Sequence, residues 1–96
     1  MNYELAKELS DAGFPQGGEG RWIMPPEQIV ARKADRIYVP TLSELIEACG
    51  RQFDGLSRIE APAQTVWNAN WGNNFEKGST PEEAVARLWL TINKKV

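Results

Sequence analysis

The sequence contains no histidine among its 96 residues. This absence excludes histidine general bases, Ser–His–Asp and Cys–His nucleophilic sites and most zinc sites, because each depends on an imidazole. Cysteine is almost as scarce, since Cys49 is the only one and no disulfide can form within the chain. Small secreted proteins usually carry several cysteines, so this scarcity favours a reducing cytoplasm.

The net charge is also small, and long apolar runs are absent from the sequence. The formal net charge is −2, whereas nucleic-acid-binding proteins usually show a basic balance. No apolar run approaches the ~18 residues of a membrane span, and the polar start with Glu4 and Glu8 lacks a signal-peptide pattern. We therefore expect one folded domain over residues 1–96, with no membrane association, and we do not favour nucleic acid as the partner.

Three segments carry helix signals. Asn2 is placed to cap a first helix over about 2–12, which we expect to end at Gly13 in a Schellman arrangement. Residues 41–44 read T-L-S-E, a capping box that predicts a second helix ending at Gly50. Residues 80–83 read T-P-E-E, another capping box with proline at the first helical position, and they predict a third helix.

Strand signals lie between these helices. Residues 21–24 and 37–39 are candidates for short strands, and residues 26–33 are a candidate short helix. Residues 56–60 and 65–71 predict a hairpin, and residues 72–79 are interpreted as a polar loop.

These elements predict an α+β fold in which three helices pack with a small antiparallel sheet, in the order α-(β)-α-β-β-α. The alternation over residues 65–71 places Trp67, Ala69 and Trp71 on the core face of the second hairpin strand. We expect the last helix to pack on this sheet through Trp89 against Trp67.

The side chains that could carry chemistry have structural explanations. Cys49 lies on the apolar face of the second helix and is interpreted as a buried core residue. Glu44 and Glu83 are explained by helix capping, and the glycines at 17, 18 and 20 match no phosphate-binding loop. We predict no catalytic, cofactor-binding or metal-binding residue, and a carboxylate-based enzyme is the least favoured function.

The segment after these glycines is the candidate interaction surface. It places an aromatic residue and a methionine beside two prolines and a basic cluster, and such residues are enriched at protein interfaces. The alternative is that Trp22 and Ile23 only cover one edge of the sheet. The candidate interface residues are Trp22, Ile23, Met24, Arg32, Lys33, Arg36 and Trp71.

Two phrases carry a resemblance to known proteins. YVPTLSELIEACG at 38–50 and GSTPEEAVARLWLTINKK at 78–95 resemble a group of short uncharacterised proteins of bacteria and of phages or prophages, which often begin like NYELAKELSDAGFPQ. The resemblance implies that the protein acts in a bacterial or host-cell cytoplasm. Because no activity is established for that group, the resemblance assigns no functional residue. A G-x-T-x-E-E-A phrase is also similar to one in HicB-type antitoxins, matched here by Gly78, Thr80, Glu82, Glu83 and Ala84.

The sequence leaves several functions open. The favoured one is a non-catalytic protein-interaction module or phage-type accessory protein, whose partner is another protein or a second copy of the chain. The second is an antitoxin-like regulator associated with nucleic acid, and the third is the carboxylate-based enzyme.

Overall fold

The computed structural model describes residues 1–24, 36–51, 53–60 and 62–93. The α+β class with three helices is confirmed, and the order over the described ranges is α-β-β-α-β-β-β-α. The candidate helix at 26–33 lies outside the described residues. The elements are α1 Tyr3–Asp11, β1 Arg21–Ile23, β2 Ile37–Val39, α2 Leu42–Cys49, β3 Phe53–Glu60, β4 Thr65–Trp71, β5 Asn74–Gly78 and α3 Pro81–Asn93.

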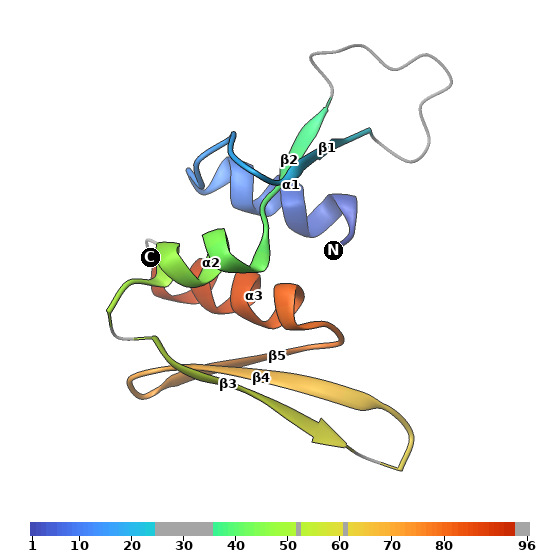
Figure 1. The fold of residues 1–96 in the computed structure, drawn as a ribbon, viewed down its shortest axis with the longest axis vertical. Helices are drawn as coiled ribbons and strands as arrows, with labels where there is room; N and C mark the ends of the chain where they lie inside the picture. Colours follow the sequence, from blue (N-terminus) through green and yellow to red (C-terminus); the bar gives the residue numbers. More distant parts are fainter. Residues whose placement is uncertain (25–35, 52, 61, 94–96) are drawn as a thin grey trace.

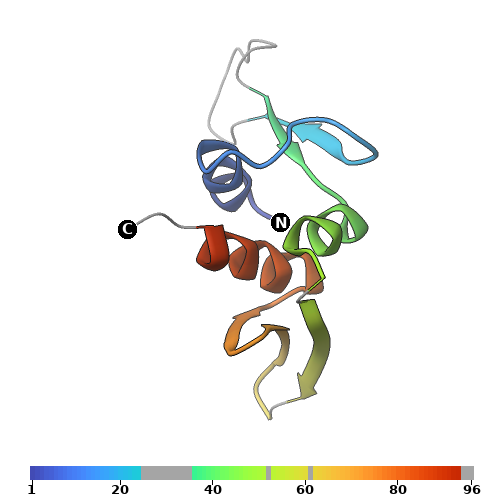
Figure 2. The same cartoon turned by 90° about the vertical axis from the view of Figure 1, so that its left-hand side faces the viewer.

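The elements are stacked in layers (Figures 1 and 2). Helix α1 and the β1–β2 hairpin form one end, α2 and α3 form the middle, and the β3–β4–β5 sheet forms the other end. Helix α3 contacts α1, α2, β4 and β5. The described strands therefore form two antiparallel sheets rather than the single small sheet predicted, and the helical layer lies between them.

The ends of α1 follow their local sequence signals. Asn2 Oδ1 accepts the Leu5 N–H at 2.8 Å, as an N-cap does. At the other end Gly13 has a φ of +94°, and the Phe14 N–H donates to the Leu9 carbonyl at 2.9 Å while the Gly13 N–H donates to Ser10 at 3.1 Å. These two bonds form the predicted Schellman motif, which turns Phe14 back into the core beside Leu9.

The capping box of α2 is complete, whereas that of α3 is half formed. Thr41 Oγ1 accepts the Glu44 N–H at 3.2 Å, and Glu44 Oε1 accepts the Thr41 N–H at 2.8 Å. Thr80 Oγ1 likewise accepts the Glu83 N–H at 3.1 Å. The Glu83 carboxylate binds the Ser79 hydroxyl at 2.7 Å instead of reaching back to Thr80, because Ser79 offers both a hydroxyl and a backbone N–H.

The predicted polar loop over 72–79 is wrong, because Asn74–Gly78 forms strand β5. Trp71 pairs with Asn74, so Gly72 and Asn73 make a two-residue hairpin turn. Gly72 has a φ of +58°, which suits the glycine that type II′ turns place first. The sheet order is β3-β4-β5, with all neighbours antiparallel.

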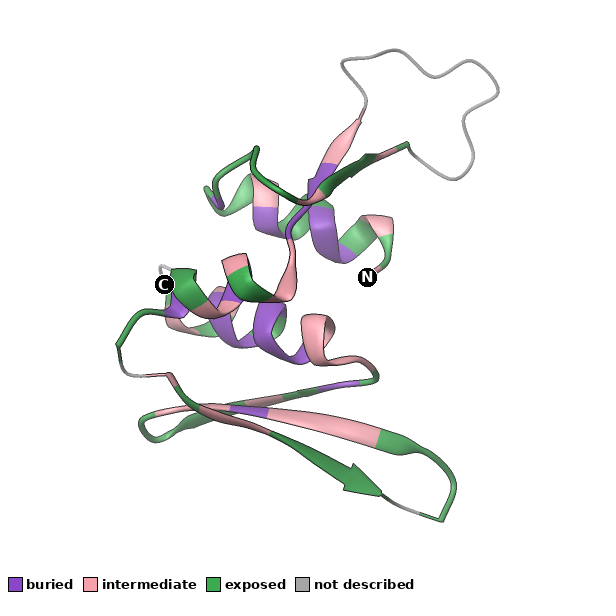
Figure 3. Cartoon of the chain, viewed as in Figure 1, coloured by how far each residue is buried: buried purple, intermediate pink, exposed green. Residues whose placement is uncertain are grey.

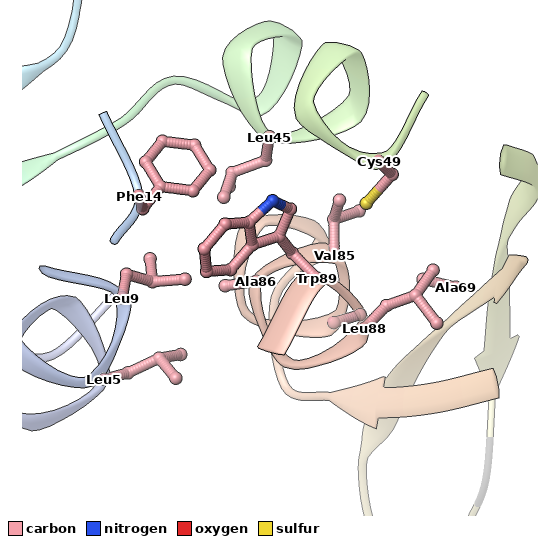
Figure 4. Packing of buried hydrophobic residues seen from close by; sticks show 11 residues of the cluster. Leu5, Leu9, Phe14, Leu45, Cys49, Ala69, Val85, Ala86, Leu88 and Trp89 are labelled. Atoms are coloured by element: carbon pink, nitrogen blue, oxygen red, sulfur yellow. The ribbon is translucent and has the colours of Figure 1, made fainter. Parts of the chain in front are cut away.

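The core lies mainly between α3 and the two other helices, with Ala69 and the sheet on the far side (Figure 4). The Trp89 ring meets the Phe14 ring edge-on, with centroids 4.9 Å apart and an interplanar angle of 76°. Figure 4 shows Trp89 pointing toward Phe14 and Leu45, while Leu88 points toward Ala69.

Helix α3 therefore packs on the sheet through Leu88, and the prediction that Trp89 does so is wrong. Successive residues of a helix are about 100° apart, so neighbouring side chains can face different layers. The predicted core face of β4 is confirmed, since Ala69 is fully buried and Trp67 and Trp71 pack against the core cluster.

Candidate functional site

The β1–β2 hairpin carries the first half of the predicted interface. Trp22 pairs directly with Tyr38 across the strands, and their ring centroids lie 5.4 Å apart. Tyr38 is fully buried, whereas Trp22 remains 47% exposed and Met24 41% exposed. The indole thus meets a buried ring at an interplanar angle of 59° and remains about half exposed to solvent.

The Tyr38 hydroxyl is the centre of a hydrogen-bond cluster. It donates to the Glu44 carboxylate, whose oxygens lie 2.7 and 2.9 Å away, and it accepts the Gly20 N–H at 2.7 Å. The same carboxylate accepts the Thr41 N–H. We call this cluster of Tyr38, Glu44, Thr41 and Gly20 the Tyr38 latch, because it ties β2 and the glycine loop to the start of α2.

Close approach explains two of the glycines in the loop before β1. A Cβ on Gly20 would collide with the Val39 carbonyl oxygen and lie 2.7 Å from the Tyr38 hydroxyl. A Cβ on Gly18 would collide with the Glu44 carboxylate, and the φ of Gly18 is +144°. The loop is therefore glycine-rich in order to pack against the latch, and no phosphate-binding role is needed to explain it.

The contacts within the latch shift the pKa values of both Glu44 and Tyr38 further from neutral pH. The Thr41 N–H and then the Tyr38 hydroxyl lower the pKa of Glu44. Burial, followed by the hydrogen bond to Glu44, raises the pKa of Tyr38. At neutral pH the Glu44 carboxylate is charged and the Tyr38 phenol keeps its proton, so the hydrogen bond between them is formed. A general acid or base needs a pKa near the working pH. Both pKa values are instead shifted away from neutral pH, which does not suit that role.

The other predicted interface residues do not all join this surface. Ile23 is half-buried in β1, and Arg36 is half-buried just before β2. Arg32 and Lys33 lie outside the described residues. Trp71 belongs to β4 in the other sheet, on the far side of the helical layer from Trp22 (Figure 1).

Trp71 has a structural role of its own. Its Nε1–H donates to the Cys49 carbonyl at 2.8 Å, and its ring packs against the core cluster. This bond satisfies the last turn of α2 and ties it to the sheet. The structure therefore does not bring Trp71 and Trp22 together on one surface.

The remaining candidates for chemistry are accounted for by packing. Cys49 is 5% exposed, and burial raises the pKa of its thiol to about 11, which confirms the core interpretation. No group of three or more potential metal ligands occurs among the described residues. Over the same ranges, every helix is too short or too polar to cross a membrane.

Sequence reasoning missed the Tyr38 latch and two exposed apolar residues of the second sheet, Ile59 and Phe75. The latch had no local signal, because Gly20 and Tyr38 are 18 positions apart. Phe75 was missed because its strand was interpreted as a loop.

Comparison of the chain with protein-family models, with curated proteins and with solved structures found no match.

Proposed function

We propose that this protein is a non-catalytic protein-interaction module that binds a partner protein through a surface centred on Trp22 and Met24. The observation that supports this proposal is the exposure of Trp22, which is 47% accessible although its ring rests on the fully buried Tyr38. Tryptophan and methionine are enriched at protein interfaces, and tryptophan is prominent among the residues that dominate binding energy.

Preorganisation strengthens the case for Trp22 as an anchor. Binding normally costs free energy when rotamer-rich side chains become ordered at the interface. Here the Tyr38 hydroxyl is fixed by Glu44 and by the Gly20 N–H, so the phenol ring that contacts the indole is already held in place before a partner binds. A held aromatic side chain loses less freedom on binding than one on a loose loop.

A catalytic role has less support. The two carboxylates with lowered pKa values, Glu44 and Glu83, owe the shift mainly to local hydrogen bonds that cap α2 and fix Ser79 before α3. These bonds occupy the carboxylates in the folded state. We further propose, from the resemblance of residues 38–50 and 78–95, that the module is an accessory protein of a phage or prophage acting in the cytoplasm.

The test compares two exposed aromatic residues at opposite ends of the molecule. Trp22→Ala should abolish capture of a protein partner from the source cell extract, or dissociate a homodimer in sedimentation velocity, while the chain stays folded by circular dichroism. Phe75→Ala is the matched control, since Phe75 is also exposed but lies in β5, and it should retain the partner.

Two results would contradict the proposal. One is a partner that binds Trp22→Ala and the parent equally well. The other is a Trp22→Ala variant that loses the fold as it loses the partner, because Trp22 would then be a structural residue of the hairpin.

A further inference from the structure

The β3–β4–β5 sheet has two unlike faces. One face lies against α3, where the Thr91 hydroxyl donates to Glu76 at 3.0 Å. Because side chains alternate along a strand, the neighbours of Glu76 in β5, Phe75 and Lys77, project from the opposite face. None of the described elements covers that face (Figures 1 and 3), and Phe75 is 59% exposed there.

The strand register arranges this open face in rows. Gly55, Asn70 and Phe75 lie side by side in one row, and Ser57, Asn68 and Lys77 in the next, followed by the pair Ile59 and Val66. The amides of the two asparagines are in contact, since Asn68 Nδ2 donates to Asn70 Oδ1 at 3.1 Å.

Gly55 widens the row that contains Phe75. A Cβ built on Gly55 would meet no atom within 4 Å, so the space beside Asn70 is open on the side away from Phe75. A planar group lying on the Phe75 ring could therefore extend over Asn70 without meeting a side chain from β3.

The charge on this face differs from that of the chain as a whole. The chain has 13 acidic residues and a net charge of −2, whereas the rows hold one ammonium group, Lys77, and one carboxylate, Asp54, which shares the β-bulge opposite Asn70 with Gly55. The acidic residue next to Gly55, Asp54, accepts the Gly72 N–H at 2.8 Å at the β4–β5 turn. The face thus presents an aromatic ring, paired amides and a cation, with the Asp54 carboxylate held at the end next to the β4–β5 turn.

We propose that the open face of this sheet binds single-stranded nucleic acid, with a base stacked on Phe75, the Asn68 and Asn70 amides at base edges, and Lys77 on a phosphate. Aromatic side chains on an exposed sheet are a general platform for unstacked bases. Amides both donate and accept hydrogen bonds, as base edges require.

Other occupants fit this face less well. A duplex hides its bases within the stack, so Phe75 could not reach them. A second copy of the chain would bury Lys77, Asp54 and the amides in the interface, and burying these charged and polar groups is costly. An acidic peptide would find only one cation and would leave the ring and the amides without a specific role.

The experiment measures binding of the full chain to a fluorescently labelled 12-nucleotide single strand by anisotropy. Phe75→Leu keeps an apolar side chain but removes the ring, and it should weaken binding about tenfold or more. Phe75→Trp should retain binding. Trp22→Ala is the control on the opposite side of the helical layer and should bind like the parent, which keeps this test separate from the proposed protein-interaction surface.

Salt dependence gives a second readout. With Lys77 as the one cation on the face, the slope of log K against log salt should be about −0.7, and Lys77→Gln should remove most of it. The proposal is overturned by the absence of binding at low salt, by equal binding of a duplex, or by unchanged affinity in Phe75→Leu. A slope several times steeper would also overturn it, because binding would then depend on basic residues elsewhere in the chain.

Discussion

Removal of the Trp89 side chain is the most direct test of the core. Trp89 is 7% exposed and joins α3 to the loop after α1 through its edge-on contact with Phe14. Trp89→Ala should lower the free energy of unfolding by ~3–5 kcal/mol, the range for large aromatic residues in cores. Of this loss, about 0.5–1.5 kcal/mol belongs to the ring pair. Because small domains are stable by roughly 5–15 kcal/mol, the variant should be close to unfolding.

The measurement is urea denaturation followed by far-ultraviolet circular dichroism, which does not depend on the tryptophan removed. Trp22→Ala is the matched control, because it deletes the same side chain at a half-exposed position and should cost far less. A double-mutant cycle of Trp89→Ala with Phe14→Leu should give a coupling energy within the range of the ring pair. If Trp89→Ala is no more destabilising than Trp22→Ala, the core is not organised around α3 as described.

The remaining predictions concern local contacts. Thr80→Ala should cost ~1 kcal/mol in denaturant melts through loss of the α3 N-cap, and an unchanged midpoint would refute this role. Cys49, with a pKa of about 11, should react slowly with a thiol reagent at pH 8 until denaturant is added, and rapid stoichiometric labelling would contradict its burial. Because hydrogen bonds lower the pKa of Glu44, its carboxylate stabilises the fold above its unfolded pKa of about 4.3, and this contribution is lost as the pH falls through the folded-state pKa. Glu44→Gln should therefore flatten the fall in unfolding free energy below about pH 5, and a profile identical to the parent would exclude the latch as its source.

The helix ends were predictable because their signals are local. The caps at Asn2 and Thr41 involve partners three positions away, and the Schellman motif at Gly13 involves residues within one turn. The hairpin of β3 and β4 was also readable, since the alternation that places Ala69 in the core is a property of consecutive residues.

The features that were not predicted correctly depend on partners distant in sequence or on a weak local pattern. Strand β5 is polar except for Phe75, so its alternation was hidden, although Gly72 at the first turn position was a usable signal. The direction of Trp89 is set by which layer contacts each side of α3, and no local pattern fixes that. The hydrogen bond from Trp71 to the Cys49 carbonyl could not be predicted either, because the two residues are 22 positions apart in the sequence.

The candidate site was predicted in part. The sequence singled out Trp22 and Met24 because they resist a capping or core explanation, and the structure places both in a half-exposed position. The Trp22 ring contacts Tyr38 and is 47% exposed, and the two alternatives for it, an interface or the cover of a sheet edge, both stay predictions. The latch that supports it was not foreseen, because it forms between a loop, a strand and a helix start.

Helix α3 links the two surfaces for which we propose partners. It contacts α1 and α2 on one side and β4 and β5 on the other, and Trp89 and Leu88 face these two layers from adjacent positions (Figure 4). A change within α3 should therefore weaken both surfaces together. Trp22 and Phe75 lie in different sheets. The effects of substitutions at distant sites on free energy are usually additive. Binding of a partner at the hairpin should then leave the affinity of the proposed nucleic-acid surface of the sheet unchanged.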